Sequence, residues 1–158
     1  MSSRGPGERV KIGSMVLAIL ATFCAGLFAG AAIYINAVEH PARLACGTAL
    51  AVREFAPSYH RATIMQVPLA VVGLLASVGA WWSSGHGTFV IGGLVLVGVV
   101  PFTLLGIIPT NRRLLAPGLD PGSPEADGLL RRWGRLHAVR SVLGVLAFGI
   151  LLMALARS

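Results

Sequence analysis

Four apolar stretches, each near the length of a membrane-spanning helix, dominate this chain of 158 residues. A helix needs about 20 apolar residues to cross a hydrocarbon core of about 30 Å, and the stretches predict helices over about 12–38, 60–82, 88–108 and 125–156. Only 12% of the residues are charged, against about 25% in a soluble domain, which excludes a water-soluble globule. We therefore predict an all-α fold, an integral membrane four-helix bundle, as a single domain over residues 1–158.

Helix-breaking residues mark the predicted connections. Pro41 is expected to end the first helix, and the polar segment after it to include a short interfacial helix over Leu44–Phe55. The second connection is only SSGHG, which predicts a tight antiparallel pair of helices. The third runs from Pro109 to about His137 and contains LAPGLDPGSPEADG. Within it, Ser123 has the character of an N-cap, so the last helix is expected to begin well before its apolar part.

Basic residues are unequally divided between the two ends of the predicted bundle. At the end with both termini and the SSGHG loop they are Arg4, Arg9, Lys11 and Arg157. At the opposite end they are Arg43, Arg53, Arg61, Arg112, Arg113, Arg131, Arg132, Arg135 and Arg140. Because basic loops stay on the cytoplasmic side, we expect a multi-pass protein of the cell membrane with its long loops cytoplasmic. Seven of these nine arginines, all except Arg61 and Arg140, are expected to extend toward lipid head groups.

Polar side chains gather at this same end of the bundle, away from the termini. Polar groups at membrane depth are costly and usually functional, and ligand sites in bundles are built from facing helices. All four predicted helices deliver such groups, which predicts a site here. The sets that share a helix face are Asn36, Glu39 and His40 on the first helix, Tyr59, Thr63 and Gln66 on the second, and Trp133, His137 and Arg140 on the fourth, with Asn111 after the third.

Two other kinds of ligand are not favoured by these patterns. Glu39, His40, His60 and His137 form a nitrogen and oxygen set of the kind that binds transition metals, but their spacing matches no established metal motif. We therefore predict no bound metal and no other cofactor. The net charge of +7 does not indicate nucleic acid, because the basic residues lie between apolar runs and form no patch on a soluble fold.

Four short motifs, in this order, resemble those of the anthrone-oxygenase-like membrane family, also known as domain of unknown function 1772. They are NAVEHPA at 36–42, FAPSYHRATIMQ at 55–66, PTN at 109–111, and Trp133 with His137 and Arg140. The similarity extends from Gly26 to the last helix. It implies a four-helix membrane protein with a pocket at the motif-bearing end. Fungal members oxidise anthrones to anthraquinones, whereas many bacterial members have no assigned substrate.

The resemblance implies oxidation of a hydrophobic aromatic, anthrone- or phenol-like substrate by O2. Such a reaction needs a base, for which histidine is suited, donors for a developing oxyanion, and an apolar slot for flat rings. We expect His137 or His40 to be the base, with Glu39 orienting His40. The predicted catalytic residues are His137, His40, Glu39, Tyr59 and Arg140, and the predicted substrate-binding residues are Asn111, Trp133, Gln66 and Arg61.

A second function stays open: a non-enzymatic small membrane protein that binds a ligand or serves as an accessory subunit. Its arginines would bind anionic lipid, and its polar residues would be spread over a surface. In an enzyme, the same polar residues would instead converge on a pocket. The partners expected are a hydrophobic small molecule and membrane lipid, with a homo-oligomer left open.

Overall fold

The computed structural model describes residues 6–158, with side chains from residue 12 onward. Arg4, one of the basic residues on which the predicted orientation rests, lies outside the described residues. Within residues 6–158 the chain is helical and contains no strand. The elements are α1 (Pro6–Tyr34), the π-helical η1 (Ile35–Glu39), α2 (His40–Ala45), α3 (Thr48–Ser84), α4 (Thr88–Phe102), the π-helical η2 (Thr103–Ile107), α5 (Ile108–Leu114) and α6 (Pro124–Ala156).

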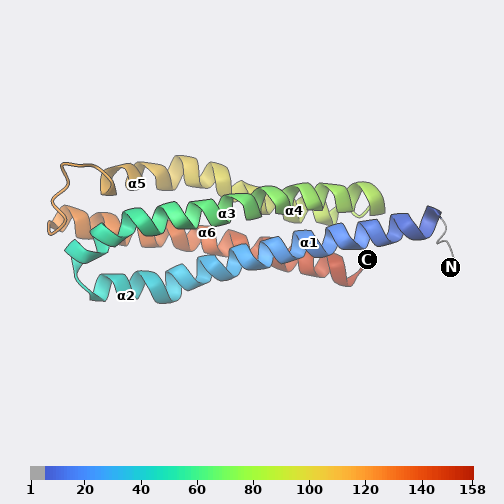
Figure 1. Cartoon of the computed structure of the whole chain (residues 1–158), viewed down its shortest axis with the longest axis horizontal. Coiled ribbons are helices and arrows are strands. Elements are labelled where there is room, and N and C mark those ends of the chain that lie inside the picture. The colour runs from blue at the N-terminus through green and yellow to red at the C-terminus, as the bar shows by residue number, and fades with distance from the viewer. Residues whose placement is uncertain (1–5) are drawn as a thin grey trace.

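These elements form four segments that are long and apolar enough to cross a membrane: Ile12–Ala45, Thr48–Ser84, Thr88–Leu114 and Pro124–Ala156. α1 packs against α3 and α6, and α4 packs against the same two helices, so the four segments form a ring. The start of α1 and the end of α6 lie at one end of the bundle, and α2 and α5 lie at the other (Figure 1). The predicted all-α four-helix membrane bundle is thus confirmed.

The first segment does not end at Pro41, contrary to prediction. It widens into the π-turn η1 and continues as α2 to Ala45. Pro41 falls in the first turn of α2, where proline is tolerated because the missing N–H would have little role there. The expected interfacial helix over Leu44–Phe55 is also absent from the described residues, since α3 begins at Thr48 and runs without interruption to Ser84.

The third segment likewise continues past its predicted end. The π-turn η2 precedes Pro109, which occupies the first turn of α5, and the helix ends only at Leu114. The third connection is therefore shorter than predicted. The expected start of the last helix is confirmed: Ser123 caps α6, its hydroxyl accepting a hydrogen bond from the N–H of Ala126 at 3.2 Å.

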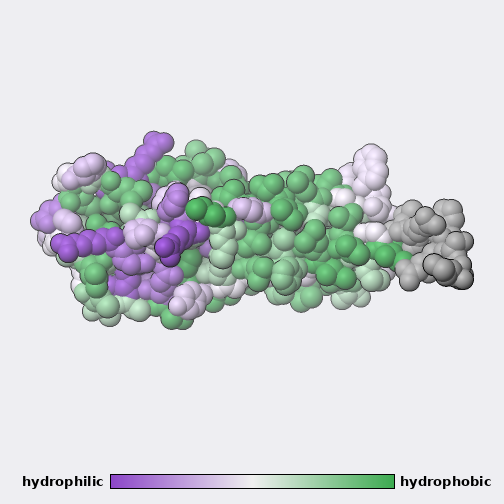
Figure 2. Space-filling view, viewed as in Figure 1, coloured by the Kyte–Doolittle hydropathy of each residue, from purple (hydrophilic) through white to green (hydrophobic). Residues whose placement is uncertain are grey.

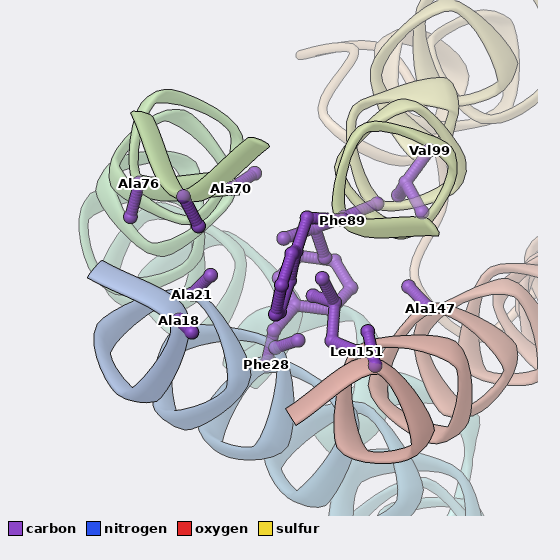
Figure 3. Close-up of a cluster of buried hydrophobic side chains, with 13 residues drawn as sticks. Ala18, Ala21, Phe28, Ala70, Ala76, Phe89, Val99, Ala147 and Leu151 are labelled. Atoms are coloured by element: carbon purple, nitrogen blue, oxygen red, sulfur yellow. The ribbon is translucent and has the colours of Figure 1, made fainter. Parts of the chain in front are cut away.

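Small side chains let the helices approach closely around a few large ones. Phe28, Phe89 and Leu151 belong to one apolar cluster that the helices surround (Figure 3). Alanines such as Ala21 and Ala147 line the surrounding helices and are fully buried. Because lipid provides no hydrophobic force between helices, such close packing is what holds a membrane bundle together.

The bundle is longer than a bilayer is thick. α3 has 37 residues, or about 55 Å at 1.5 Å per residue, whereas a bilayer with its head-group regions measures about 40–45 Å. Figure 2 shows hydrophobic residues around the middle of the molecule and hydrophilic residues concentrated at one end. That end, where α2, α5 and the start of α6 lie, carries the polar motifs.

Candidate functional site

A partly enclosed cavity of about 180 Å³ lies inside the bundle near its polar end. It separates the apolar cluster around Phe28 from a second cluster that includes Phe55 and Trp133. Its walls are mostly apolar, and all four membrane segments contribute to them. The polar or charged side chains in the walls are Arg43, Ser58, Tyr59, Thr63, Gln66, Thr103, Trp133, His137 and Arg140.

His137, on α6, is held in this wall by Asn36 of η1. The side-chain amide of Asn36 donates to the carbonyl of Gly134 at 3.1 Å, and that carbonyl can only accept. The amide oxygen of Asn36 must therefore face His137, whose Nδ1 lies 2.5 Å away. Nδ1 carries the proton and donates it to Asn36, which leaves the lone pair on Nε2. Ser141 also donates to the Asn36 oxygen, at 2.8 Å.

Gly134 provides the space in which His40 packs against α6. A Cβ atom on Gly134 would lie 2.6 Å from Nε2 of His40, closer than a side chain tolerates. The His40 ring contacts Trp133, with 5.1 Å between ring centroids, but does not line the cavity. His40 is thus a buried neighbour of the site.

Stacked aromatic rings form one wall of the cavity. Trp133 stacks on His137 with a centroid distance of 4.7 Å, and Phe55 meets Trp133 edge-on at 5.4 Å. Tyr59 stacks on Phe55 at 6.0 Å. Flat apolar surfaces of this kind favour a flat, ring-containing ligand.

Arg43 lies at the polar end of the cavity in an ionic cluster. Its guanidinium pairs with both Glu39 and Glu54 and donates to the hydroxyl of Ser58 at 3.0 Å. Ser58 in turn donates to Glu39 at 2.6 Å. The Arg43 side chain is only 4% exposed, so the expectation that it extends to lipid head groups is wrong. Two carboxylates within reach compensate its charge and allow it to be buried.

Arg140 is charged and has no carboxylate partner among the described residues. Its guanidinium carbon lies 5.0 Å from the centroid of the Phe28 ring, a cation–π distance. Apart from Arg43, whose Nε is ion-paired with Glu54, three cavity-lining groups have buried atoms without a hydrogen-bond partner among residues 12–158: the Gln66 amide, Nε1 of Trp133 and Nε of Arg140. These atoms can hydrogen-bond to a ligand, and two of the groups offer only N–H donors.

The structure brings five of the nine predicted site residues to one cavity: Tyr59, Gln66, Trp133, His137 and Arg140. The other four lie elsewhere. Glu39 and Arg61 line a separate groove between α1 and α3, because the π-turn directs Glu39 toward α3 while Asn36 and His40 face α6. Asn111 is buried, as is His40, and neither lines the cavity.

Two residues that the sequence did not assign to the site support it: Asn36, which orients His137, and Gly134, which accepts from Asn36. Asn36 stands in a predicted polar face, so the signal was present, but its position in a π-turn was not predictable from helical spacing. No group of three or more His, Cys, Asp or Glu side chains that converge as metal ligands is found within the described residues.

The protein is a membrane four-helix bundle with an internal, mostly apolar cavity. Residues 55–150 match the sequence profile of the family described as anthrone oxygenase, and the chain belongs to that family. The resemblance inferred from the motifs is thus confirmed. The matched region contains all five cavity residues named above, whereas Asn36 lies before it.

The chain is also similar to the anthrone oxygenase tpcL of Aspergillus fumigatus. The two are 39% identical over 56 residues, which cover 34% of this chain and 35% of that protein. The alignment therefore spans about a third of the curated relative's length. No solved structure matches the chain significantly.

Proposed function

We propose that this protein oxidises a hydrophobic aromatic substrate, an anthrone or a related phenol, with O2 inside the cavity. The observation that carries the proposal is the arrangement of His137, held by Asn36 with its lone pair on Nε2, in an apolar cavity that also contains Arg140. A base, a cation for a developing oxyanion and a flat apolar slot are what the reaction requires. Membership of the anthrone oxygenase family supports the same reaction.

An anthrone has a methylene group opposite its carbonyl, and the protons of this methylene group are weakly acidic. His137 would take one methylene proton on Nε2, and Arg140 would stabilise the enolate oxygen that forms. The enolate is electron-rich and transfers an electron to O2, after which a carbon–oxygen bond forms at the former methylene carbon. The resulting hydroperoxide loses water. One oxygen atom of O2 becomes the second carbonyl of the anthraquinone, and the other leaves in water.

The size of the cavity limits how a substrate can lie in it. An engineered apolar cavity of about 150 Å³ holds one benzene molecule, and this cavity measures about 180 Å³. The cavity thus accommodates the reacting ring between the aromatic wall and Arg140. The rest of a fused ring system would extend toward the opening of the cavity.

The alternative, an accessory protein, predicts that the polar residues are spread over the surface. His137 and Gln66 are instead buried, with 1% and 0% of their surface exposed, and both line the cavity. This placement favours an internal ligand over a surface partner.

The test is turnover by purified protein in detergent or nanodiscs, with a panel of anthrones and reduced polycyclic phenols. Quinone formation is followed by absorbance and O2 uptake with an electrode, and the two should be equal. His137→Ala should lower the rate per folded molecule by about 10²–10⁴-fold, the usual contribution of a general base. Arg135→Ala is the control, because Arg135 is an exposed residue of the same helix. Equal rates for the two variants would contradict the assignment of His137.

A further inference from the structure

We infer that the substrate reaches the cavity sideways from the bilayer, through an opening between α3 and the α4–η2 segment. The inference rests on the proposed function and names its substrate class: a membrane-dissolved aromatic molecule that carries an oxygen acceptor. The opening is defined by Val67 on α3, Val100 on α4 and Leu104 on η2.

These three residues line the cavity and are also exposed on the outside of the bundle. The exposed fractions are 49% for Val67, 37% for Val100 and 55% for Leu104. A side chain that borders a cavity and the exterior at once marks the rim of an opening. All three are apolar. Thr63 on α3 is the other exposed residue that lines the cavity, and its hydroxyl is bonded to the Tyr59 carbonyl of its own helix at 2.8 Å, so the rim matches lipid and not water.

The depth of the rim in the membrane follows from helix geometry. Val67 lies 17 residues before Ser84, and Leu104 lies 16 residues after Thr88, or about 24–26 Å along the helices from the short SSGHG loop. The loop must sit at one surface of a hydrocarbon core about 30 Å thick. The opening is therefore inside the hydrocarbon region, close to the head groups of the opposite leaflet.

The backbone at this point keeps the third segment from packing evenly on α3. α3 packs along α4, but within the described residues it has no extensive contact with η2 or α5. Pro101 lies inside α4 just before the π-turn η2. Prolines and π-turns are recognised causes of helix kinks, and π-turns occur often at functional sites. Pro101 and η2 therefore account for the separation of α3 from η2 and α5.

The chemistry of the walls changes from the rim inward. Apart from Thr63 the rim is aliphatic, whereas Gln66, Trp133 and Arg140 offer unpartnered buried polar atoms in the cavity. A molecule with an apolar body and a carbonyl or phenolic oxygen would gain hydrogen bonds only after passing the rim. Such molecules collect near the head-group boundary of a bilayer, which is the depth of the opening.

The competing route is the groove between α1 and α3. It shares Ser58 and Gln66 with the cavity but is bordered by Glu39, Glu54 and Arg61. Charged side chains at its edge favour water and disfavour an apolar ring.

Access can be measured without turnover by quenching the fluorescence of Trp133. Trp81→Phe and Trp82→Phe leave Trp133 as the only one of the chain's three tryptophans. The probe is 4-bromodiphenyl ether dissolved in phosphatidylcholine vesicles that contain the protein; its bromine quenches at short range and its oxygen accepts a hydrogen bond. We compare a rim-filled variant, Val67→Phe with Leu104→Phe, with a matched control.

The control is Val71→Phe with Leu105→Phe, two residues on the same elements that are exposed but do not line the cavity. A third variant, Ala31→Phe with Met65→Phe, fills the groove between α1 and α3. We expect the quenching constant to fall severalfold in the rim-filled variant and to stay unchanged in the other two.

Three results would overturn the inference: no quenching of the parent protein, equal quenching of the rim-filled variant and its control, or a fall only in the groove-filled variant. Because the readout is access to Trp133, these results do not depend on catalysis. Lateral access without turnover would contradict the proposed function alone, and turnover without lateral access would contradict this inference alone.

Discussion

Replacing Asn36 by leucine removes a polar network while nearly preserving side-chain size. Three contacts are lost: those to His137 Nδ1 at 2.5 Å, to Ser141 at 2.8 Å and to the Gly134 carbonyl at 3.1 Å. Ser141 keeps other acceptors, the carbonyls of Ala32 and His137. The Gly134 carbonyl lies inside α6 and keeps its intrahelical N–H partner, so the one uncompensated group is His137 Nδ1.

The expected destabilisation follows from this one group. A buried polar group without a partner costs about 1–3 kcal/mol, whereas hydrogen bonds between membrane helices average about 0.6 kcal/mol. The membrane value favours the lower part of the range, so we expect Asn36→Leu to lower the free energy of unfolding by about 1–2 kcal/mol. The folded variant should remain the major species in detergent.

The more specific effect is on the tautomer of His137. In the parent protein His137 should carry its proton on Nδ1, and in Asn36→Leu this preference should be lost. Nitrogen-15 NMR of histidine-labelled protein in nanodiscs distinguishes the two forms, and the chain has only four histidines. The His137 signal is assigned by its absence from His137→Ala.

Catalysis should change in parallel with the tautomer. Losing the partner that orients a functional histidine costs about 10–100-fold at metal sites, and we expect a loss of this size in turnover per folded Asn36→Leu molecule. Asn36→Asp keeps an acceptor for Nδ1 and should retain the tautomer and most of the activity. A proton on Nε2 in the parent, or an unchanged tautomer in Asn36→Leu, would refute this account of His137.

Two further predictions concern packing and topology. Gly134→Ala should destabilise the protein by about 1–3 kcal/mol, because the new Cβ would meet His40. The control is Gly128→Ala, where the space is open, and it should be neutral or slightly stabilising. Thermal unfolding measures both variants. In a background without native cysteines, a cysteine at His86 in the short loop should react with an impermeant reagent added outside cells, and one at Gly118 should not. Labelling of Gly118→Cys alone would reverse the orientation that we expect from the arginine distribution.

The elements of the bundle were predictable because membrane helices depend on local sequence. In hydrocarbon every backbone N–H and C=O must be satisfied within the helix, so about 20 apolar residues suffice to define one. The start of α6 at Ser123 was predictable for the same local reason. The prolines were misleading, since Pro41 and Pro109 lie in first turns of α2 and α5, after π-turns that no residue pattern announced.

The site was predictable only in part. Polar residues on the second and fourth membrane segments, such as Gln66 and His137, line the cavity as their helical spacing indicated. Glu39 does not, because η1 rotates successive side chains by less than an α-helix does and so points Glu39 at Arg43. His40 faces α6 at Gly134 but lies beside the cavity, packed against Trp133. Arg43 itself was expected in the head groups and is buried by its two carboxylate partners.

The class of fold, the polar end of the bundle and the family follow from the order of residues alone. Hydropathy and helical periodicity act over a few turns, and a family is defined by the order of residues along one chain. The packing of the four segments sets which polar groups share a cavity, which ring nitrogen of His137 carries the proton, and where the cavity opens. These properties depend on contacts between residues about a hundred positions apart, such as Asn36 and His137, and on two π-turns that set how the segments rotate against each other.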